Sequence, residues 1–482
     1  MRSIVRSIYE HSLEWPEKTA IIAADHTVDY ATLWKLIVGA ATLLKRKGIE
    51  PGQRVLLEAD HTVEYLALTY GIQLAGAVHV PIENSTPEKR IEEISREIDP
   101  ALVLVGKHPI AHLGVSLMEL LDVEPAAYTF PTEDMLQEIL FTTGTTGKSK
   151  GVMGTHGAQM NRFESSNEVL DYSVDNVWLI PTPMNHAAGI RKVHMSMVKG
   201  STVVLMNGFT NLKLFFQAIR EHHVTSIYLP PSGVHYILML ASKELAKYND
   251  QLDFLYSSST ALPSGDKEKL MALLPDVRKF DIYGSSETGA ACCIDYNAEK
   301  VTPGCVGGIC PGVEVFTVDE DHHPVEASAE EPGIIAIRSN AVMAGYWNEP
   351  ELTARTVQDG VVYMSDVGYV KDGYLYLLGR QDAVINVGGL KVAPTEVEDV
   401  AMRHPMVDEC VCVPFENKVV GRVIKMYVTL NEGFSLNVDE LMQHLKEHLE
   451  AYKLPKIIEE IAEIPHTYNG KIDRKKLLAE QK

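Results

Sequence analysis

The sequence lacks any continuous apolar run approaching the ~20 residues that a membrane-spanning helix needs. Residues 1–18 mix charged with apolar side chains, which is not the pattern of a secretory signal. Internal repeats and low-complexity segments are also lacking. We therefore expect a globular protein without a membrane span.

Positive charge is scarce. The chain has 44 lysines and arginines against 65 aspartates and glutamates, which gives a formal net charge of −21. Proteins that bind nucleic acids or anionic membranes usually carry a basic excess or a basic stripe. This balance argues against a nucleic-acid partner, although it permits a local basic site for an anionic nucleotide.

Cysteine is also scarce, with 6 residues in 482. None forms a C-x-x-C pair, and adjacent cysteines are a poor basis for a disulfide framework. We expect reduced and mostly buried thiols in a cytoplasmic protein. The cysteines are Cys292, Cys293, Cys305, Cys310, Cys410 and Cys412.

A length of 482 residues predicts two or more domains, because one core stops growing well before this size. Through the first 300 or so residues, short apolar runs alternate with helical patterns, which predicts parallel βα units. From Gly304 the pattern changes to antiparallel strands, over residues 313–318, 333–337 and 373–379. The fold class is therefore α/β with a small β subdomain.

Beyond residues 380–382 the sequence predicts a small α+β module of about a hundred residues. Thr395 and Glu398 have the spacing of a capping box at the start of one helix. Asn437 is expected to cap a second helix, whose apolar face carries leucines at positions 441, 445 and 449.

Residues 140–151 combine threonines, glycines and lysines directly after an apolar pair. Glycines let the backbone approach a ligand, while hydroxyl groups, free N–H groups and lysine charges favour anionic oxygens. The usual P-loop needs a glycine five positions before Gly147, and Thr142 stands there. We interpret the stretch as a different phosphate-binding loop after a strand. A polar surface turn is the alternative.

Further motifs follow this loop in a fixed order: Tyr283-Gly-Ser-Ser-Glu287, Tyr363-Met-Ser-Asp366, Gly379-Arg-Gln-Asp382 and Asn469-Gly-Lys471. Together with the loop, they resemble the adenylate-forming superfamily of acyl- and aryl-CoA ligases, peptide-synthetase adenylation domains and firefly-type luciferases. The resemblance covers essentially the whole chain. It implies an N-terminal AMP- and acyl-binding domain with two layered sheets at 1–379, a hinge at 380–382 and a mobile C-terminal lid at 383–482.

The resemblance implies a ligase that uses ATP, Mg²⁺ and coenzyme A. A carboxylic acid would first attack ATP to give an acyl-adenylate and pyrophosphate, and a thiol would then displace AMP. In this family pattern the triphosphate is held by Thr142, Thr143, Gly144, Thr145, Thr146, Gly147 and Lys150. Thr145, Glu287 and Lys471 would be catalytic, with Glu287 as the Mg²⁺ ligand and Lys471 at the carboxylate–phosphate junction.

The resemblance implies that Tyr283 stacks on adenine, within a segment completed by Gly284, Ser285 and Ser286. Asp366 would bind the ribose, with Arg380 nearby. Asp382 would be the hinge, and Lys391 would meet a phosphate of coenzyme A.

Each acidic or basic residue also has a structural alternative. Glu287 could be a carboxylate at a helix N-terminus, Asp366 an Asx-turn residue and Lys471 a solvated surface lysine. The family usually has proline at the position of Ser149 and threonine at that of Ser286.

Amino-acid-activating relatives carry a Phe-Asp pair that the segment around His186 lacks, which disfavours an amino-acid substrate. By resemblance, the acyl pocket contains His186, Ala187, Gly189, Ser259, Thr260, Ala261 and Cys310. Because most of these are small and neutral, we expect an apolar or aromatic acid. A carboxylate is already ionised at neutral pH, so His186 is interpreted as a wall residue and not as a base.

Coenzyme A is the expected thiol, as in acyl- and aryl-CoA ligases. An o-succinylbenzoate-type CoA ligase, which has a similar short length, is an alternative within this class. Two alternatives remain. One is a stand-alone enzyme that loads a carrier protein's phosphopantetheine arm. The other is a non-catalytic sensor of nucleotide or acyl ligand.

Overall fold

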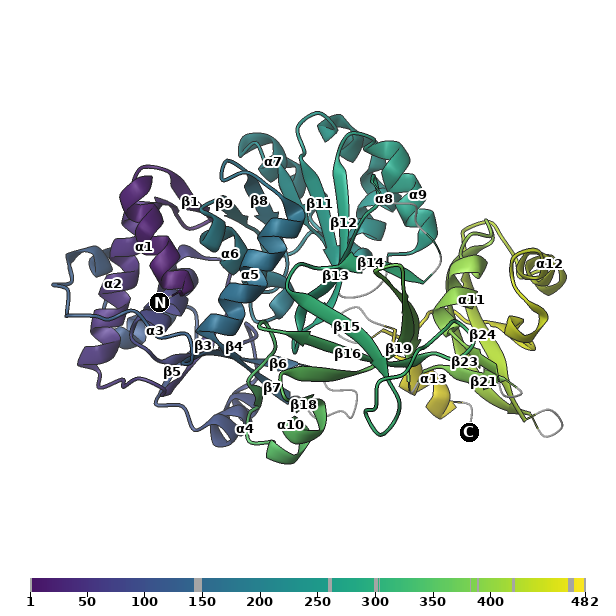
Figure 1. The fold of residues 1–482 in the computed structure, drawn as a ribbon. Helices are drawn as coiled ribbons and strands as arrows, with labels where there is room; N and C mark the ends of the chain where they lie inside the picture. The colour runs from purple at the N-terminus through teal and green to yellow at the C-terminus, as the bar shows by residue number, and fades with distance from the viewer. Residues whose placement is uncertain are drawn as a thin grey trace.

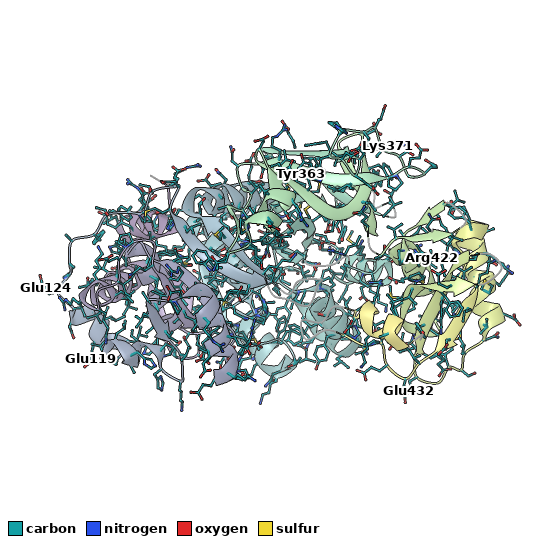
Figure 2. The ribbon with its side chains drawn as sticks, turned by 90° about the horizontal axis from the view of Figure 1, so that it is seen from below. Glu119, Glu124, Tyr363, Lys371, Arg422 and Glu432 are labelled. Atoms are coloured by element: carbon teal, nitrogen blue, oxygen red, sulfur yellow. The ribbon has the colours of Figure 1, made fainter. Side chains whose placement is uncertain are left out.

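The computed structural model describes residues 2–142, 150–258, 262–298, 302, 304–381, 383–387, 390–417, 421–466 and 472–480. A large N-terminal domain of mixed α/β architecture is followed by a small C-terminal domain at the opposite end of the molecule (Figure 1). Arg422 and Glu432 lie on the small domain, far from Glu119 and Glu124 at the other end (Figure 2). This arrangement confirms the expected fold class.

A first sheet has the strand order β17-β7-β6-β4-β3-β5. Its strands β5, β3, β4 and β6 are parallel, and β7 then returns antiparallel to β6. This return pairs Thr142 with Lys150, the two residues that flank the undescribed segment 143–149. The elements of this region are α2 (Tyr30–Arg46), β3 (Arg54–Glu58), α3 (Val63–Leu74), β4 (Val78–Ile82), α4 (Glu88–Ile98), β5 (Leu102–Leu104), the 3-10 turns η1 (Pro109–Leu113) and η2 (Met118–Asp122), β6 (Leu136–Thr142), β7 (Lys150–Thr155) and β17 (Gly345–Tyr346).

The parallel half of a second sheet runs in the order β12-β11-β10-β8-β9-β1, with β2 antiparallel at its edge. Trp178, Tyr228 and Phe254 on its strands are fully buried, which anchors the sheet between its helices. The elements are α1 (Ile4–Glu14), β1 (Thr19–Ile22), β2 (Thr27–Asp29), α5 (His156–Leu170), β8 (Val177–Ile180), α6 (Ala187–Lys199), β9 (Thr202–Leu205), α7 (Leu212–Glu221), β10 (Ser226–Tyr228), α8 (Pro231–Leu245), η3 (Ala246–Tyr248), β11 (Phe254–Ser258), α9 (Ser264–Leu273) and β12 (Arg278–Ser285).

The antiparallel strands expected after Gly304 continue this second sheet beyond β12, in the order β13-β14-β20-β19-β16-β15. Figure 2 shows Tyr363 and Lys371 on this part of the molecule. The elements are β13 (Gly289–Asp295), β14 (Cys305–Ile309), β15 (Val313–Val318), β16 (Gly333–Ser339), α10 (Pro350–Thr356), β18 (Val357–Gln358), β19 (Val361–Lys371) and β20 (Tyr374–Arg380).

The C-terminal domain has its own apolar core, in which Val397, Met426 and Leu441 are fully buried. Its elements are β21 (Ile385–Val387), β22 (Leu390–Val392), α11 (Pro394–Ala401), β23 (Val407–Asn417), β24 (Gly421–Leu430), α12 (Val438–His448), η4 (Ala451–Lys453), β25 (Ile457–Glu460) and α13 (Arg474–Glu480). The side chain of Asn437 caps α12 as expected.

The capping box expected at Thr395 and Glu398 is wrong. Helix α11 begins two residues earlier than the capping box implies, at Pro394, with Ala393 at the cap and no side-chain cap bond. Proline has a backbone angle already suited to the first helical position, so Thr395 falls inside the first turn. Glu398 is 4% exposed, and its carboxylate forms an ion pair with Arg474 of the same domain.

One side chain of the C-terminal domain caps a helix of the N-terminal domain. Helix α9 begins after Pro263 and has no side-chain cap bond from its own N-cap residue. The Asp399 carboxylate of α11 accepts from the Ser264 backbone N–H at 2.9 Å and from its hydroxyl at 2.6 Å. An acidic group is favoured at this end of a helix.

All six cysteines lie in the described part of the chain as free thiols, and five of them are buried, as expected. Among the described helices, none has the length and apolarity to span a bilayer.

Candidate active site

A cleft of about 2670 Å³ is lined by residues of both domains. A pocket for one small molecule usually encloses roughly 300–1,000 Å³. This cleft is therefore large enough to hold a nucleotide, an acid and part of a third ligand together. Most of the described residues expected to form the site line it.

The flanks of the expected phosphate loop lie at one wall of this cleft. The Thr142 hydroxyl donates to the Lys150 carbonyl at 3.4 Å, and both residues line the cleft. Lys150 Nζ lies 5.4 Å from the ring centroid of Tyr346. Five expected triphosphate ligands lie outside the described residues, as does the unusual Ser149: Thr143, Gly144, Thr145, Thr146 and Gly147.

Glu287 lies next to this wall, in the turn between β12 and β13. Its position excludes the alternative of a helix N-terminal carboxylate. Oε1 of Glu287 accepts from the Tyr346 hydroxyl at 2.7 Å. Burial, followed by the Glu287 charge, raises the pKa of Tyr346, so its phenol remains a donor. Tyr346 thus lies between the expected metal ligand and Lys150.

The local backbone explains how Glu287 is held. The Ser285 hydroxyl accepts from the N–H groups of Glu287 and Thr288, at 3.1 and 3.2 Å. The Thr288 hydroxyl accepts from the Ser285 N–H at 3.0 Å. These short-range bonds fix a tight polar turn that a strand pairing could not supply.

Two buried arginines donate hydrogen bonds to the backbone carbonyls of the same turn. Arg162 donates to the carbonyls of Ser286 and Glu287, both at 2.9 Å, and Arg191 donates to Ser286 at 3.2 Å. Burial, followed by the Arg191 charge, lowers the pKa of Arg162. Arg191 also pairs with the fully buried Glu138 at 2.9 Å. Because Glu138 lies on β6 and Arg191 on α6, this cluster ties the strand before the phosphate loop to the helix of the expected acyl pocket.

The residues present fit a Mg²⁺ ion that is shared with a bound triphosphate. In the described parts of the chain, no three His, Cys, Asp or Glu side chains are grouped so that they could hold a metal by themselves. Mg²⁺ is usually bound through one or two carboxylates together with substrate phosphates and water. Glu287 lines the cleft beside Lys150 and can supply such a carboxylate.

The expected adenosine side of the site is assembled on three strands of the second sheet, β12, β19 and β20. The Tyr283 hydroxyl on β12 donates to Asp366 Oδ2 at 2.7 Å. Asp366 on β19 is directly opposite Arg380 on β20. Because Asp366 lies within a strand, the Asx-turn alternative is excluded. Burial, followed by the Asp366 charge, raises the pKa of Tyr283.

The expected acyl pocket is only partly described. His186 is at the N-cap position of α6 without a side-chain cap bond, and both His186 and Ala187 line the cleft. Gly189 does not line the cleft. It packs against the backbone of Pro183, so closely that an added Cβ would lie 2.2 Å from the Pro183 carbonyl oxygen. Cys310 is 3% exposed and does not line the cleft either, and burial raises its thiol pKa to about 12. Ser259, Thr260 and Ala261 lie outside the described residues.

Three expected residues of the C-terminal part cannot be placed by their side chains. Lys471 and Asp382 lie outside the described residues, and only the backbone of Lys391 is described, in β22. The helix that follows Lys471 is nevertheless held firmly. One guanidinium nitrogen of Arg474, at the start of α13, donates to both carboxylate oxygens of Glu398 of α11, at 2.6 and 2.7 Å.

Four residues that support the site were not predicted from the sequence: Tyr346, Arg162, Arg191 and Glu138. Each lies inside an apparently ordinary strand or helix pattern. A charged residue directly before an apolar run, such as Glu138 before residues 139–141 of β6, was the available signal, because an unpaired charge is rarely buried.

Comparison with known proteins matches residues 8–347 to the family described as "AMP-binding enzyme" and residues 396–471 to "AMP-binding enzyme C-terminal domain". The first match alone covers well over half of the chain. The protein therefore belongs to the AMP-binding enzymes, the adenylate-forming superfamily that its motifs resemble.

Curated relatives share about a quarter of the sequence. A linear gramicidin synthase polypeptide of Brevibacillus parabrevis is 26% identical over 97% of this chain, which spans only 6% of that much longer protein. The fatty acid–[acyl-carrier-protein] ligase ScoC of Streptomyces coeruleorubidus is 27% identical, with 99% of this chain and 96% of the relative covered. The indoleacetate–CoA ligase of Aromatoleum aromaticum is 27% identical, with 95% and 94% covered.

Among solved structures, ATP-bound MatB from Rhodopseudomonas palustris has a TM-score of 0.88 and 22% identity, with 100% of this chain and 99% of that one covered. The likeness shows that the two chains share a fold.

Proposed function

We propose that this adenylate-forming enzyme is an AMP-forming acid–thiol ligase that joins a carboxylic acid to coenzyme A. The observation that supports this most strongly is the arrangement of one cleft. Lys150, Tyr346 and Glu287 lie at one wall, and the Tyr283–Asp366 pair lies beside Arg380 at another. These groups match a triphosphate with its metal ion on one side and an adenosine on the other.

In the first half-reaction, an oxygen of the acid attacks the α-phosphorus of ATP. The bond from this phosphorus to the bridging oxygen breaks, and pyrophosphate leaves. Negative charge accumulates on the phosphates, so catalysis depends on positioning and electrostatic stabilisation. Lys150 and the segment 143–149 bind the phosphates, and Glu287 would hold the Mg²⁺ that neutralises them. Lys471 would reach the reacting oxygen from the C-terminal domain.

In the second half-reaction, a thiol sulfur forms a bond to the acyl carbon of the adenylate. The bond from this carbon to the phosphate oxygen breaks, and AMP leaves while the thiol proton passes to solvent. Asp382 would be the hinge about which the C-terminal domain rotates between the half-reactions. The rotation would move Lys471 away from the reacting oxygen and open a path for the thiol beside Lys391. Likeness to a CoA ligase over nearly the whole length of both chains supports coenzyme A as the acceptor.

A carrier-protein acceptor is the second candidate. It is supported by the equally extensive likeness to ScoC, a ligase named for an acyl carrier protein. The phosphopantetheine arm is common to both acceptors, so the two candidates share the thiol chemistry.

A panel of carboxylic acids, assayed for pyrophosphate with Mg²⁺ and ATP, tests the proposal. We expect release that requires both an acid and Mg²⁺, and an acyl-CoA product when coenzyme A is added. Pyrophosphate release without formation of an acyl-CoA would favour a carrier protein as the acceptor of the acyl group. No release with any acid would contradict ligase function and favour a nucleotide or acyl sensor.

A further inference from the structure

Lys192 on α6 is a cationic side chain on the wall of the cleft. It lines the cleft and is partly exposed, whereas its helix neighbours Arg191 and Val193 are buried. Lys192 Nζ donates to the Tyr256 hydroxyl at 2.7 Å. It also lies 4.4 and 5.0 Å from the ring centroids of Tyr256 and Tyr228. The ammonium group is therefore held by aromatic side chains of two neighbouring parallel strands, β10 and β11.

The charge of Lys192 is not balanced by the residues around it. In the part of the chain that the structure describes, no carboxylate lies within ion-pair distance of Lys192 Nζ, and the charge that affects its pKa is that of Arg191. Arg191 has the same sign and is itself paired with Glu138. Burial, followed by the Arg191 charge, lowers the pKa of Lys192 to about 7. Because this ammonium faces the cleft without a carboxylate partner among the described residues, an anion from outside the chain can pair with it.

The surroundings of Lys192 can bind both an anion and an apolar body. An ammonium group has three N–H donors, and the hydrogen bond to Tyr256 uses one of them. The Ser258 hydroxyl lies close by, 3.1 Å from that of Tyr228. Phe163 and Met195 line the same cleft and supply apolar surface.

Lys192 also lies at a distance from the start of the expected acyl pocket. Ala187 starts α6 at the expected acyl pocket, and Lys192 follows five residues later. At 1.5 Å per residue, the lysine lies about 7.5 Å further along the helix axis. An anion bound by Lys192 would lie several bond lengths from the wall of the expected acyl pocket at Ala187.

We propose that Lys192 is a specificity-determining residue that binds a second carboxylate of the substrate. The acid that the enzyme activates is then a dicarboxylic acid whose two carboxylates are separated by an apolar or aromatic body. This inference rests on the proposed ligase function and narrows it. The sequence predicted an apolar or aromatic acid in a mostly neutral pocket, and Lys192 adds a charged end to that pocket.

The test compares dicarboxylic acids of increasing length, aliphatic and aromatic, each with its own monoamide. The monoamide keeps the shape and one reacting carboxylate but removes the distal charge. For the wild type we expect kcat/KM in the pyrophosphate assay to be about a hundredfold higher for the best diacid than for its monoamide. Lys192→Met should remove this preference, and Lys192→Arg should retain most of it. Lys199→Met, at the end of the same helix and outside the cleft, is the matched control.

Equal kcat/KM for each diacid and its monoamide in the wild type would overturn the inference while leaving the ligase function intact. If Lys192→Met lowers kcat/KM equally for the diacid and its monoamide, the inference is also overturned and the ligase function again remains intact. Calorimetric binding of the same pairs gives a readout that does not require turnover. If no acid releases pyrophosphate, tighter binding of the diacid that Lys192→Met abolishes still supports the role of Lys192, and equal binding contradicts it.

Discussion

At the scale of single residues, the site depends on neutral groups that position charged ones. Tyr346 donates to Glu287 and lies against Lys150, and Tyr283 donates to Asp366. Both phenols have raised pKa values, because burial and the adjacent carboxylate disfavour their ionised forms. They therefore remain donors across the physiological pH range and orient the carboxylates without adding charge.

Glu287→Gln should abolish most adenylation, by about a hundredfold or more, because the amide keeps the shape but cannot neutralise a divalent cation. The Mg²⁺ concentration for half-maximal pyrophosphate release should rise in parallel. Tyr346→Phe should cause a smaller loss, about tenfold, since it removes only the bond that orients Glu287. If Glu287→Gln shows an unchanged Mg²⁺ requirement, its assignment as the metal ligand is wrong.

The affinity for a diacid should depend on pH through Lys192. Its lowered pKa of about 7 means that the free enzyme carries the ammonium below pH 7 and loses it as the pH rises. Since only the ammonium pairs with a carboxylate, KM for the diacid should increase above about pH 7, and KM for the monoamide should stay flat. The groups that face Lys192 are Arg191 on the same helix and the phenols of Tyr228 and Tyr256. Burial raises the pKa of Tyr256, so this phenol adds no charge change near pH 7.

Lys192→Arg is the control for this pH profile, because arginine does not lose its proton in proteins. The variant should bind the diacid with a pH-independent KM. A wild-type profile that is identical for diacid and monoamide would contradict the titration of Lys192.

At the scale of helices and strands, the sequence predicted the framework better than the contacts. The strands expected over residues 313–318 and 333–337 are present as β15 and β16, because their largely apolar residues favour extended structure. The capping box in α11 failed because a neighbouring proline decided where the helix begins. Local patterns therefore predicted which segments are regular, and not always where they start.

The contacts that support the site could not be predicted in the same way. Arg162 and Ser286 are 124 residues apart in the chain, and Arg191 and Glu138 are 53 apart. Only the sheet order brings such pairs together. The motif residues around Glu287 and Asp366 were predicted by resemblance. The buried cluster of Arg162, Arg191 and Glu138 could be recognised only from the three-dimensional fold.

Arg474→Met should impair adenylation by about tenfold to a hundredfold, because its ion pair with Glu398 holds the helix that begins three residues after Lys471. It should also destabilise the C-terminal domain, by up to about 3–5 kcal/mol, since it leaves the Glu398 carboxylate buried without its partner. The measurements are pyrophosphate release and the free energy of unfolding.

The double variant Glu398→Gln/Arg474→Met separates the two effects. It should regain part of the lost stability, because no unpaired charge remains, but not the adenylation rate. Lys471→Ala is the benchmark for a loss confined to adenylation, with thiol transfer from a preformed acyl-adenylate retained. If Arg474→Met slows both half-reactions equally, the helix does not position Lys471.

At the scale of the whole molecule, the bond from Ser264 to Asp399 joins the two domains next to the cleft. Asp399→Ala should loosen this arrangement and alter the ratio of the two half-reaction rates, while small-angle scattering should report a more extended average shape. Glu432→Ala, an exposed change on the same domain, should do neither (Figure 2). An unchanged rate ratio in Asp399→Ala would mean that this contact does not influence the domain orientation.

The same bond gives helix α9 a cap that is not its own. If the C-terminal domain turns between half-reactions, Asp399 leaves and the backbone N–H of Ser264 loses its acceptor, at a cost of about 0.5–2 kcal/mol. Hydrogen–deuterium exchange at this one amide would then report the orientation of the domain directly. The amide should exchange slowly in the orientation described here and faster under ligand conditions that favour another one.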